Sequence, residues 1–170
     1  MPSKKKSRKI LEAIEEKQIE TTADVNLASV KLVIFTLLNG YYAFQGESIK
    51  EILPTSKINV VPGVPNFILG VINVRGDIES VININDFLGL PEQNSENDKN
   101  IIIAEGAGIR SGILVSSVED VMDFPEASIQ PPLSSLNEKI KPFVIGETDY
   151  KKKNVTVLNV QEIFKNISAN

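Results

Sequence analysis

The sequence predicts a mainly β protein made of two similar small lobes. Many short runs rich in β-branched residues recur along the chain, which is typical of a barrel or a sandwich. Turn signals separate these runs, and the strongest is Asn39-Gly40, a pair that favours a two-residue hairpin turn. Only short helical patterns interrupt the strands, so we expect helices to play a minor part.

An internal repeat indicates two lobes. Residues 67–70 (FILG) resemble residues 143–146 (FVIG) at an offset of 76 positions, and residues 81–87 resemble a second segment at the same offset. Residues 49–53 show a weaker likeness to residues 118–122. A shared offset points to repeated units, each of which we expect to end in a strand and a helical turn.

The composition excludes several classes of function. The chain has 170 residues, of which 42% are hydrophobic, so it can form a core of ordinary size. It has no cysteine and no histidine, which removes disulfides, thiolate or imidazole metal ligands and the usual triads. We therefore expect no metal site, no cofactor and no catalytic residue. A net charge of −4 argues against nucleic-acid binding. No apolar run is long enough to insert in a membrane, and the start lacks the features of a secretory signal.

Residues 1–29 differ from the rest of the chain and are expected to form an N-terminal extension. A basic tip, from Lys4 to Lys9, precedes Ile10, Leu11, Ile14 and Ile19, which recur at near-helical spacing. This pattern predicts a short amphipathic helix over about residues 8–20. The extension is either a solvated segment or a helix that docks on a partner or on the main domain, residues 30–170.

The main domain alternates short strands with turns, and we expect each break at glycine, proline or asparagine. Strands are predicted at residues 30–37, 41–44, 48–53 (or one helical turn), 58–61, 71–74, 78–84, 101–104, 113–115, 118–124, 143–145 and 155–160. A helical turn is predicted at 87–90, a polar loop at 91–99, an irregular connection at 128–141 and a helix at 161–167.

Arg75-Gly76-Asp77 is the most informative turn, because it lies between two strands rich in β-branched residues. Gly76 can adopt a positive φ that other residues resist. A tight turn holds Arg75 at a fixed point, which suits recognition.

Three motifs that suggest other chemistry do not fit their patterns. The glycines of residues 106–112 lack the spacing and the following helix of a dinucleotide site. Residues 92–98 lack the order of a calcium loop. Glu119 and Asp120 are neighbours in a predicted strand, so they face opposite sides.

Residues 70–85 (GVINVRGDIESVININ) resemble the signature of the CheW family of chemotaxis coupling proteins. That signature is roughly Gly-x-Ile-Asn-Leu-Arg-Gly, two or three further residues, then Pro-Val-x-Asp-Leu. The matching positions are Gly70, Ile72, Asn73, Arg75, Gly76 and Val81. Flanking segments such as SIKEILP and SGILVSSVEDVMDF are similar to further family segments, so the resemblance covers about residues 30–168.

The sequence departs from the family pattern at four polar positions. Ser80 stands where proline is usual, and Asn83, Ser116 and Asn159 stand where acidic residues are common. A carboxylate would accept hydrogen bonds from nearby backbone more strongly than these side chains can.

The resemblance implies two five-stranded SH3-like β-barrels and a non-enzymatic adaptor. Such an adaptor links the tips of methyl-accepting chemoreceptors to the regulatory domain of a chemotaxis histidine kinase. It also implies a cytoplasmic protein held in receptor arrays at the inner membrane.

The residues expected to bind receptor or kinase lie in two segments. A groove that takes a helical receptor tip by its apolar face would be lined by Ile49, Gly70, Val71 and Ile72. Asn73 would bond partner side chains, and Gly76 would shape the turn. The resemblance implies that Arg75 pairs with Glu51.

Other functions remain open at this stage. One is a coupling protein of a pilus or gliding motility pathway, and another is an unrelated β-barrel interaction module. An oligonucleotide-binding barrel fits poorly, because residues 21–170 carry 12 basic and 18 acidic residues. An enzyme that works with carboxylates alone would need a deep pocket with convergent acids.

Overall fold

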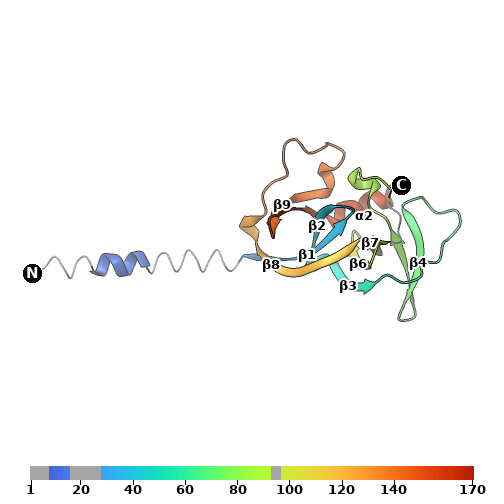
Figure 1. Cartoon of the computed structure of the whole chain (residues 1–170), viewed down its shortest axis with the longest axis horizontal. Coiled ribbons are helices and arrows are strands. Elements are labelled where there is room, and N and C mark those ends of the chain that lie inside the picture. The colour runs from blue at the N-terminus through green and yellow to red at the C-terminus, as the bar shows by residue number, and fades with distance from the viewer. Residues whose placement is uncertain (1–7, 16–27, 93–96) are drawn as a thin grey trace, which may run out of the picture.

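The structure is a computed structural model, and it describes residues 8–15, 28–92 and 97–170. Within these residues, ten strands and a C-terminal helix form the main domain (Figure 1). The strands are β1 (Ser29–Leu37), β2 (Gly40–Gln45), β3 (Ile49–Pro54), β4 (Ile68–Val74), β5 (Asp77–Ile82), β6 (Asn100–Gly106), β7 (Ile109–Val115), β8 (Ser117–Pro125), β9 (Val144–Tyr150) and β10 (Lys153–Leu158), and the helix is α2 (Val160–Ser168). Short 3-10 turns are η1 (Gly46–Ser48), η2 (Asp86–Leu88), η4 (Glu126–Ser128) and η5 (Lys141–Phe143).

Two five-stranded sheets confirm the predicted mainly β fold with two lobes. Lobe A has the strand order β8-β1-β2-β10-β9, and lobe B has the order β3-β6-β7-β5-β4. Lobe B is one continuous segment, residues 49–115, whereas lobe A joins the N-terminal hairpin to the last three strands. Figure 1 shows this, because lobe A combines blue strands with orange and red ones.

The repeat in the sequence is a repeat in the structure. The bounds of β4 and β5 become those of β9 and β10 when 76 is added to each residue number. The β4–β5 ladder skips a residue between Ile68 and Gly70, and the β9–β10 ladder skips one between Val144 and Gly146. In each lobe the repeated hairpin joins its neighbour through a parallel pair, β5 with β7 and β10 with β2.

One predicted strand is wrong. Residues 58–61 form no strand, and only Asn59 makes an isolated bridge, to Val71. The prolines that enclose this segment, Pro54 and Pro62, break the extended run and remove backbone donors. Of the two alternatives predicted for residues 48–53, the strand is confirmed, because β3 starts at Ile49, directly after η1 ends at Ser48.

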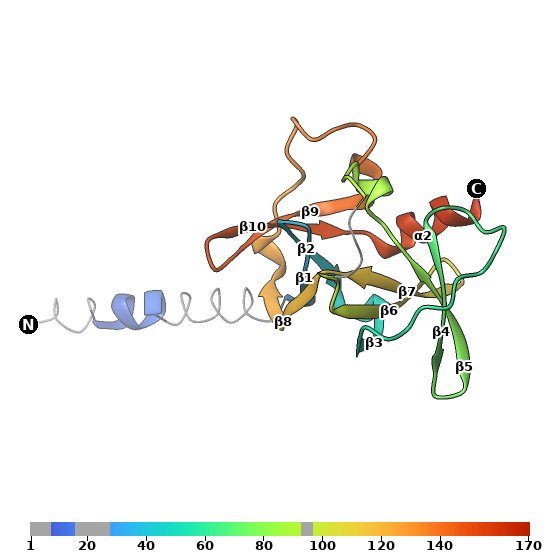
Figure 2. The same ribbon diagram turned by 45° about the vertical axis from the view of Figure 1, so that its right-hand side comes forward.

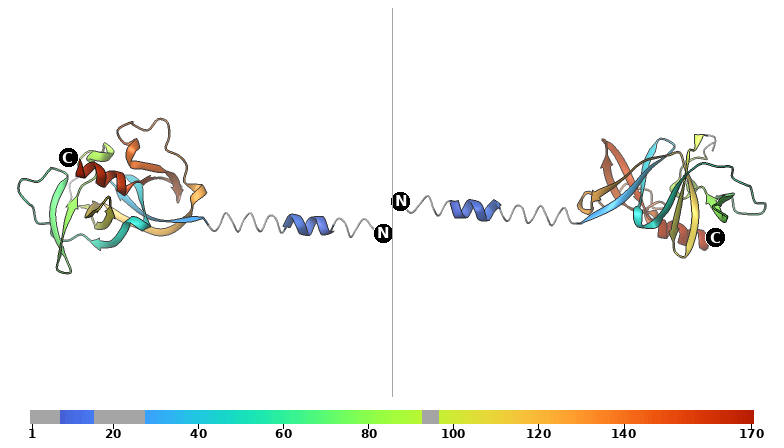
Figure 3. Two further views of the ribbon diagram at one scale, coloured as in Figure 1. Left: turned by 180° about the vertical axis from the view of Figure 1, so that it is seen from behind. Right: turned by 90° about the horizontal axis from the view of Figure 1, so that it is seen from below.

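A shared core joins the two lobes. One cluster of buried residues contains Phe35 and Phe44 from lobe A, Ile102 and Ile113 from lobe B, and Phe164 from α2. The helix therefore lies against both lobes, as the views of Figure 3 illustrate. Each lobe also has a smaller cluster of its own. Because the shared cluster is continuous, we expect the lobes to keep a fixed relation to each other.

The N-terminal extension is described only in part. Residues 8–15 form a helix, and the remainder of the predicted helix, residues 16–20, lies outside the described residues. Among the helices that the structure describes, we find none with the length and apolar character needed to cross a bilayer.

Candidate functional site

The turn between β4 and β5 holds Arg75 in an unusual backbone conformation. Arg75 has a φ of 53° and Gly76 a φ of 92°, and positive values at both central residues are typical of a type I′ hairpin turn. The side-chain oxygen of Asn73 accepts a hydrogen bond from the Gly76 N–H at 2.9 Å. This oxygen therefore stabilises the turn. The turn was predicted from the sequence, but this role of Asn73 was not.

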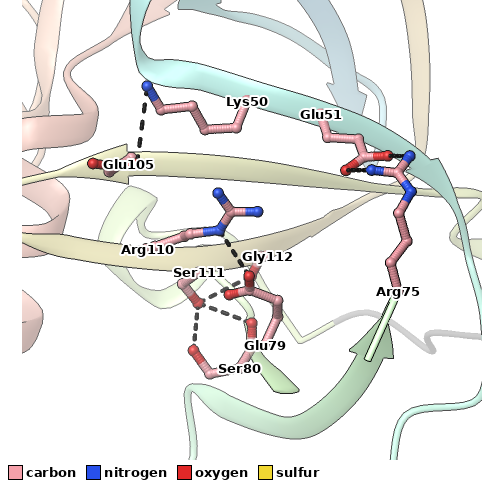
Figure 4. A network of polar contacts seen from close by, with 9 residues as sticks. All are labelled: Lys50, Glu51, Arg75, Glu79, Ser80, Glu105, Arg110, Ser111 and Gly112. Atoms are coloured by element: carbon pink, nitrogen blue, oxygen red, sulfur yellow. Dashed lines mark hydrogen bonds and ion pairs between the residues drawn. The ribbon is translucent and has the colours of Figure 1, made fainter. Parts of the chain in front are cut away.

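Arg75 and Glu51 form the pair that the resemblance implies (Figure 4). The guanidinium Nη1 donates to Glu51 Oε2 at 3.2 Å, and Nη2 contacts Glu51 Oε1. The two contacts are the two-point geometry in which arginine matches a carboxylate. The Arg75 side chain is 78% exposed and that of Glu51 is 19% exposed. The guanidinium is thus fixed in direction while its outer face stays open to water.

The ion pair connects the two edges of the lobe B sheet. Glu51 lies on β3 and Arg75 directly follows β4, and these two strands are the first and last in the sheet order. The pair therefore closes the seam of the lobe. At this exposure it contributes only ~0–1 kcal/mol to stability. Its main effect is to hold the hairpin tip in one orientation against β3.

Lobe A has an equivalent seam contact with different residues. There the Tyr150 hydroxyl, at the end of β9, donates to Asp120 Oδ2 on β8 at 2.9 Å. Lys151 occupies the position equivalent to Arg75 and has a similar φ of 47°. The pKa of Lys151 is raised, first by its hydrogen bond with Tyr150, then by the charges of Tyr150, Asp120 and Glu119.

Gly70 is fixed by a close approach of backbone. A Cβ at this position would lie 2.3 Å from the carbonyl oxygen of Asn59. Val71 exchanges two backbone hydrogen bonds with Asn59, each of 2.9 Å. Gly70 and Val71 thus anchor the loop of residues 55–67 on β4, so in this structure they hold that loop in place.

The remaining aliphatic candidates are mostly internal. Ile72 is 2% exposed and belongs to the core cluster of lobe B. Ile49 is half-buried and packs against the shared core. The structure therefore brings together Glu51, Asn73, Arg75 and Gly76 at the hairpin, and leaves Ile72 without an accessible surface.

Ile78, which the sequence patterns did not single out, is 65% exposed beside this turn. It pairs with Asn73 across the hairpin, and its neighbour Glu79 points inward and is 7% exposed. Counting alternate residues back from buried Val81 would have placed Ile78 outside and Glu79 inside. A large exposed apolar side chain on the same hairpin as a fixed guanidinium is a typical feature of a protein-binding surface.

Further polar contacts hold the strands behind the turn (Figure 4). Buried Glu79 pairs with Arg110 Nε at 2.7 Å, and Lys50 lies 3.9 Å from Glu105. The Ser80 and Ser111 hydroxyls are 2.8 Å apart, which links β5 to β7 where the two strands run parallel. Ser80, one of the departures from the family pattern, is therefore part of a structural link.

The other departures also have defined contacts. The side-chain oxygen of Asn83 accepts from the Asn85 N–H at 2.8 Å, and that of Asn159 accepts from the Glu162 N–H at 3.2 Å. These two asparagines are 76 positions apart, but only Asn159 is the N-cap of its helix, α2, whereas Asn83 bonds the residue that precedes η2. Ser116 Oγ accepts from the Leu38 N–H at 3.2 Å. Each of these three side chains thus accepts a hydrogen bond from a backbone N–H, and a carboxylate at the same position could accept it as well.

Comparisons with known proteins agree with this geometry. A family model described as a CheW-like domain matches residues 31–168. The chain is similar to the chemotaxis protein CheW of Bacillus subtilis, with 33% identity over 109 residues, which are 64% of this chain and 69% of that protein. It is also similar to the crystal structure of the scaffolding protein CheW from Thermoanaerobacter tengcongensis, with 29% identity, a TM-score of 0.69, and coverage of 80% of this chain and 92% of that one.

A longer relative matches as well. The chemotaxis protein CheV3 of Helicobacter pylori is 25% identical over 162 residues. The match covers 89% of this chain and 52% of CheV3, so this chain spans about half of that relative.

Proposed function

The chain belongs to the CheW-like domain family, and we propose that it is a non-enzymatic adaptor that couples chemoreceptor tips to a chemotaxis histidine kinase. It would act in the cytoplasm, within receptor arrays at the inner membrane. Its relatives are named as chemotaxis and scaffolding proteins, which supports an adaptor role. The observation that carries the proposal is the fixed, outward-facing guanidinium of Arg75 at the family's central motif.

The surface at the β4–β5 hairpin has the chemistry of a protein-binding site. Interfaces commonly place an apolar side chain beside an arginine, with polar groups around them. Ile78 and Arg75 supply these groups, and Glu51 keeps the guanidinium in place so that little side-chain freedom is lost on binding. Ile49, Gly70, Val71, Ile72, Asn73 and Gly76 would support this surface from behind.

Each partner would bind through a modest contact. A specific interface typically covers about 800 Å² on each protein. Micromolar affinity, about −8 kcal/mol, suits an array that holds together through many weak contacts.

The direct test is to titrate the protein separately with a receptor tip fragment and with the kinase regulatory domain. Isothermal calorimetry would measure both affinities. We expect saturable binding to both partners. Binding to neither partner would overturn the proposal, and binding to one alone would remove the coupling role.

Arg75→Ala tests the site. We expect the melting temperature to change little, because the exposed pair contributes only ~0–1 kcal/mol. We expect at least one affinity to weaken by about tenfold, or ~1.4 kcal/mol, and receptor-coupled kinase activation to fall in a reconstituted assay. Unchanged activation would refute the role of Arg75.

Two further variants sharpen this test. Lys165→Ala removes another exposed ion pair, with Glu162 at 3.0 Å on α2, and should leave coupling unchanged. The double variant Arg75→Glu with Glu51→Arg keeps an internal pair and reverses the outer charge. If Arg75 touches the partner directly, this double variant should fail as Arg75→Ala does, whereas recovery would assign Arg75 a purely internal role.

A further inference from the structure

Lobe A has a cavity at the end where the chain enters it. The cavity has a volume of about 350 Å³, and its apolar wall consists of Val30, Ile129, Pro131, Pro132 and Ile145. This size lies at the lower end of the range of pockets that take organic ligands.

Lobe B has equivalent residues at the corresponding end. Ile58 and Leu69 occupy the positions equivalent to Ile129 and Ile145, and each pair packs on the core of its own lobe. Val81 pairs with Gly112 and Val157 pairs with Ala43, so Leu114 of lobe B is equivalent to Gln45 of lobe A.

The two lobes differ in the side chain at this position. Leu114 is 5% exposed inside its cluster, whereas Gln45 is half-buried at the cavity. Lobe A therefore lacks an apolar side chain that lobe B has, and the missing volume contributes to the cavity.

The helix of residues 8–15 carries apolar side chains that are exposed to solvent. Ile10, Leu11 and Ile14 are 60%, 59% and 49% exposed. In a helix with 3.6 residues per turn these three positions lie on one face. Three aliphatic side chains on one face need a covering surface.

The chain between this helix and lobe A ends at the cavity itself. The Ala28 carbonyl accepts a hydrogen bond from the Glu126 N–H at 3.0 Å, and Val30 and Glu126 both line the cavity. Residues 16–28 can span at most roughly 3.5 Å each, so the helix stays within about 45 Å of the cavity. Such a tether gives a high effective concentration of one group near the other.

Charge favours an approach of the basic tip, Lys4 to Lys9, to the main domain, although Arg8 also lies 3.6 Å from Glu12 within the helix. Arg8 and Lys9 begin the helix, and Glu126 lies at the cavity. Residues 21–170 carry a net charge of −6, from 12 basic and 18 acidic residues. The basic start of the chain is therefore attracted to the acidic main domain.

We propose that residues 8–15 of this chain dock their apolar face into the lobe A cavity. Ile10, Leu11 and Ile14 fill the space that Leu114 helps to fill in lobe B, and Arg8 and Lys9 lie towards Glu126. This docking is independent of the adaptor function, because it completes lobe A rather than the β4–β5 surface.

Paramagnetic relaxation in solution tests this contact on the full chain. The sequence has no cysteine, so Glu12→Cys, on the polar side of the helix, accepts a single spin label. We expect strong broadening of the backbone amide signals of Ile129 and Ile145. The Gly76 amide, in the turn between β4 and β5, should keep its intensity, because Figure 2 shows this hairpin on the opposite side of the domain from β8 and β1.

Matched variants separate docking from random encounters. Leu11→Asp places a charge on the apolar face and should abolish the broadening. Ala13→Asp adds the same charge about 110° from the centre of that face at 100° per residue, and should leave the broadening unchanged. Pro131→Asp, at an exposed position on the cavity wall, should abolish it from the other side.

Three results would overturn the proposal. The first is an absence of broadening at Ile129 and Ile145, both without and with anionic vesicles. The vesicles are included because binding to them would identify a membrane as the partner of the helix. The second is broadening that survives Leu11→Asp. The third is equal broadening in a mixture of spin-labelled chain and ¹⁵N-enriched chain without a spin label. That result would assign the contact to a second copy.

Discussion

Gly70 and Gly146 hold equivalent positions, and each lies against a backbone carbonyl. A Cβ would lie 2.3 Å from Asn59 O at the first position and 2.3 Å from Gln130 O at the second. Both carbonyls belong to the isolated bridges that fix the long loops of the two lobes. Both glycines are therefore required by the space available to them.

Gly70→Ala should destabilise the protein by more than ~2 kcal/mol, because the Asn59 bridge must move to admit the methyl group. Urea denaturation would measure the loss. Gly63→Ala is the matched control: Gly63 has a φ of 78°, but a methyl group there would have no other atom within 4 Å. It should lose only the ~1–2 kcal/mol of a left-handed residue. Equal losses at both sites would contradict the steric argument.

Asp98 is partly buried, which disfavours the charged form of its carboxylate. Burial raises its pKa, and a hydrogen bond with Ser116 offsets only part of that rise. Its Oδ1 is buried without a hydrogen-bond partner among the described residues. A folded pKa above the unfolded value of about 3.9 means that the folded state binds the proton more tightly.

Asp98→Asn should therefore stabilise the protein relative to wild type as pH rises. Below the unfolded pKa the carboxyl is protonated in both states, and the variant gains little. The gain appears as pH rises from about 3.9 through the raised folded pKa, and it is complete above that value. Urea midpoints at pH 3.5 and pH 7 would measure this, with exposed Asp149→Asn as control. An equal difference at both pH values would exclude Asp98 as the cause.

At the scale of elements, α2 depends on one cap. Asn159 accepts from the Glu162 N–H, while Ile163 and Phe164 are fully buried in the shared core. Asn159→Ala should cost about 1 kcal/mol, and Asn159→Asp should keep the cap. Thermal unfolding would measure both. Asn166→Ala, at an exposed position in the same helix, should be neutral or slightly stabilising. A loss at Asn166 equal to that at Asn159 would argue against the cap.

Local patterns predicted most strands, but not how the strands are combined. Runs of β-branched residues and glycine turns mark most of the ladders within a few residues. The pairing of β1 with β8 joins Leu32 to Met122, which no local pattern indicates. The failure at residues 58–61 is also physical, because the prolines on either side limit the pairing of this segment with β4 to the single bridge of Asn59 and Val71.

The candidate site was predictable for a different reason. The Arg75–Glu51 pair joins residues 24 positions apart, and only the family resemblance connected them. The exposure of Ile78 depends on the register of β5 and needed the structure. At the lobe A cavity Gln45 takes the place of Leu114, an equivalence that only the strand pairings reveal.

At the scale of the whole molecule, the shared core makes the lobes interdependent. Lobe A contains both termini of the main domain and surrounds lobe B in the chain, so lobe A is not complete before β10 is made. Phe35 and Phe44 lie 4.6 Å apart between ring centroids inside the cluster that also holds lobe B residues. A rigid frame of this kind would hold the β4–β5 surface in a fixed orientation relative to lobe A.

Ile103→Ala tests whether the lobes unfold as one unit. Ile103 is fully buried in the core that belongs to lobe B alone, so the change should cost ~2–5 kcal/mol. Native-state hydrogen exchange would follow amides in β2 of lobe A and β6 of lobe B. Because the shared core couples the lobes, protection should fall by the same free energy in both. Val155→Ala, in the core of lobe A, is the reciprocal control and should also lower protection in both lobes. Wild-type protection of β2 in the Ile103→Ala variant would show that lobe A folds without lobe B, and the rigid frame would then need another explanation.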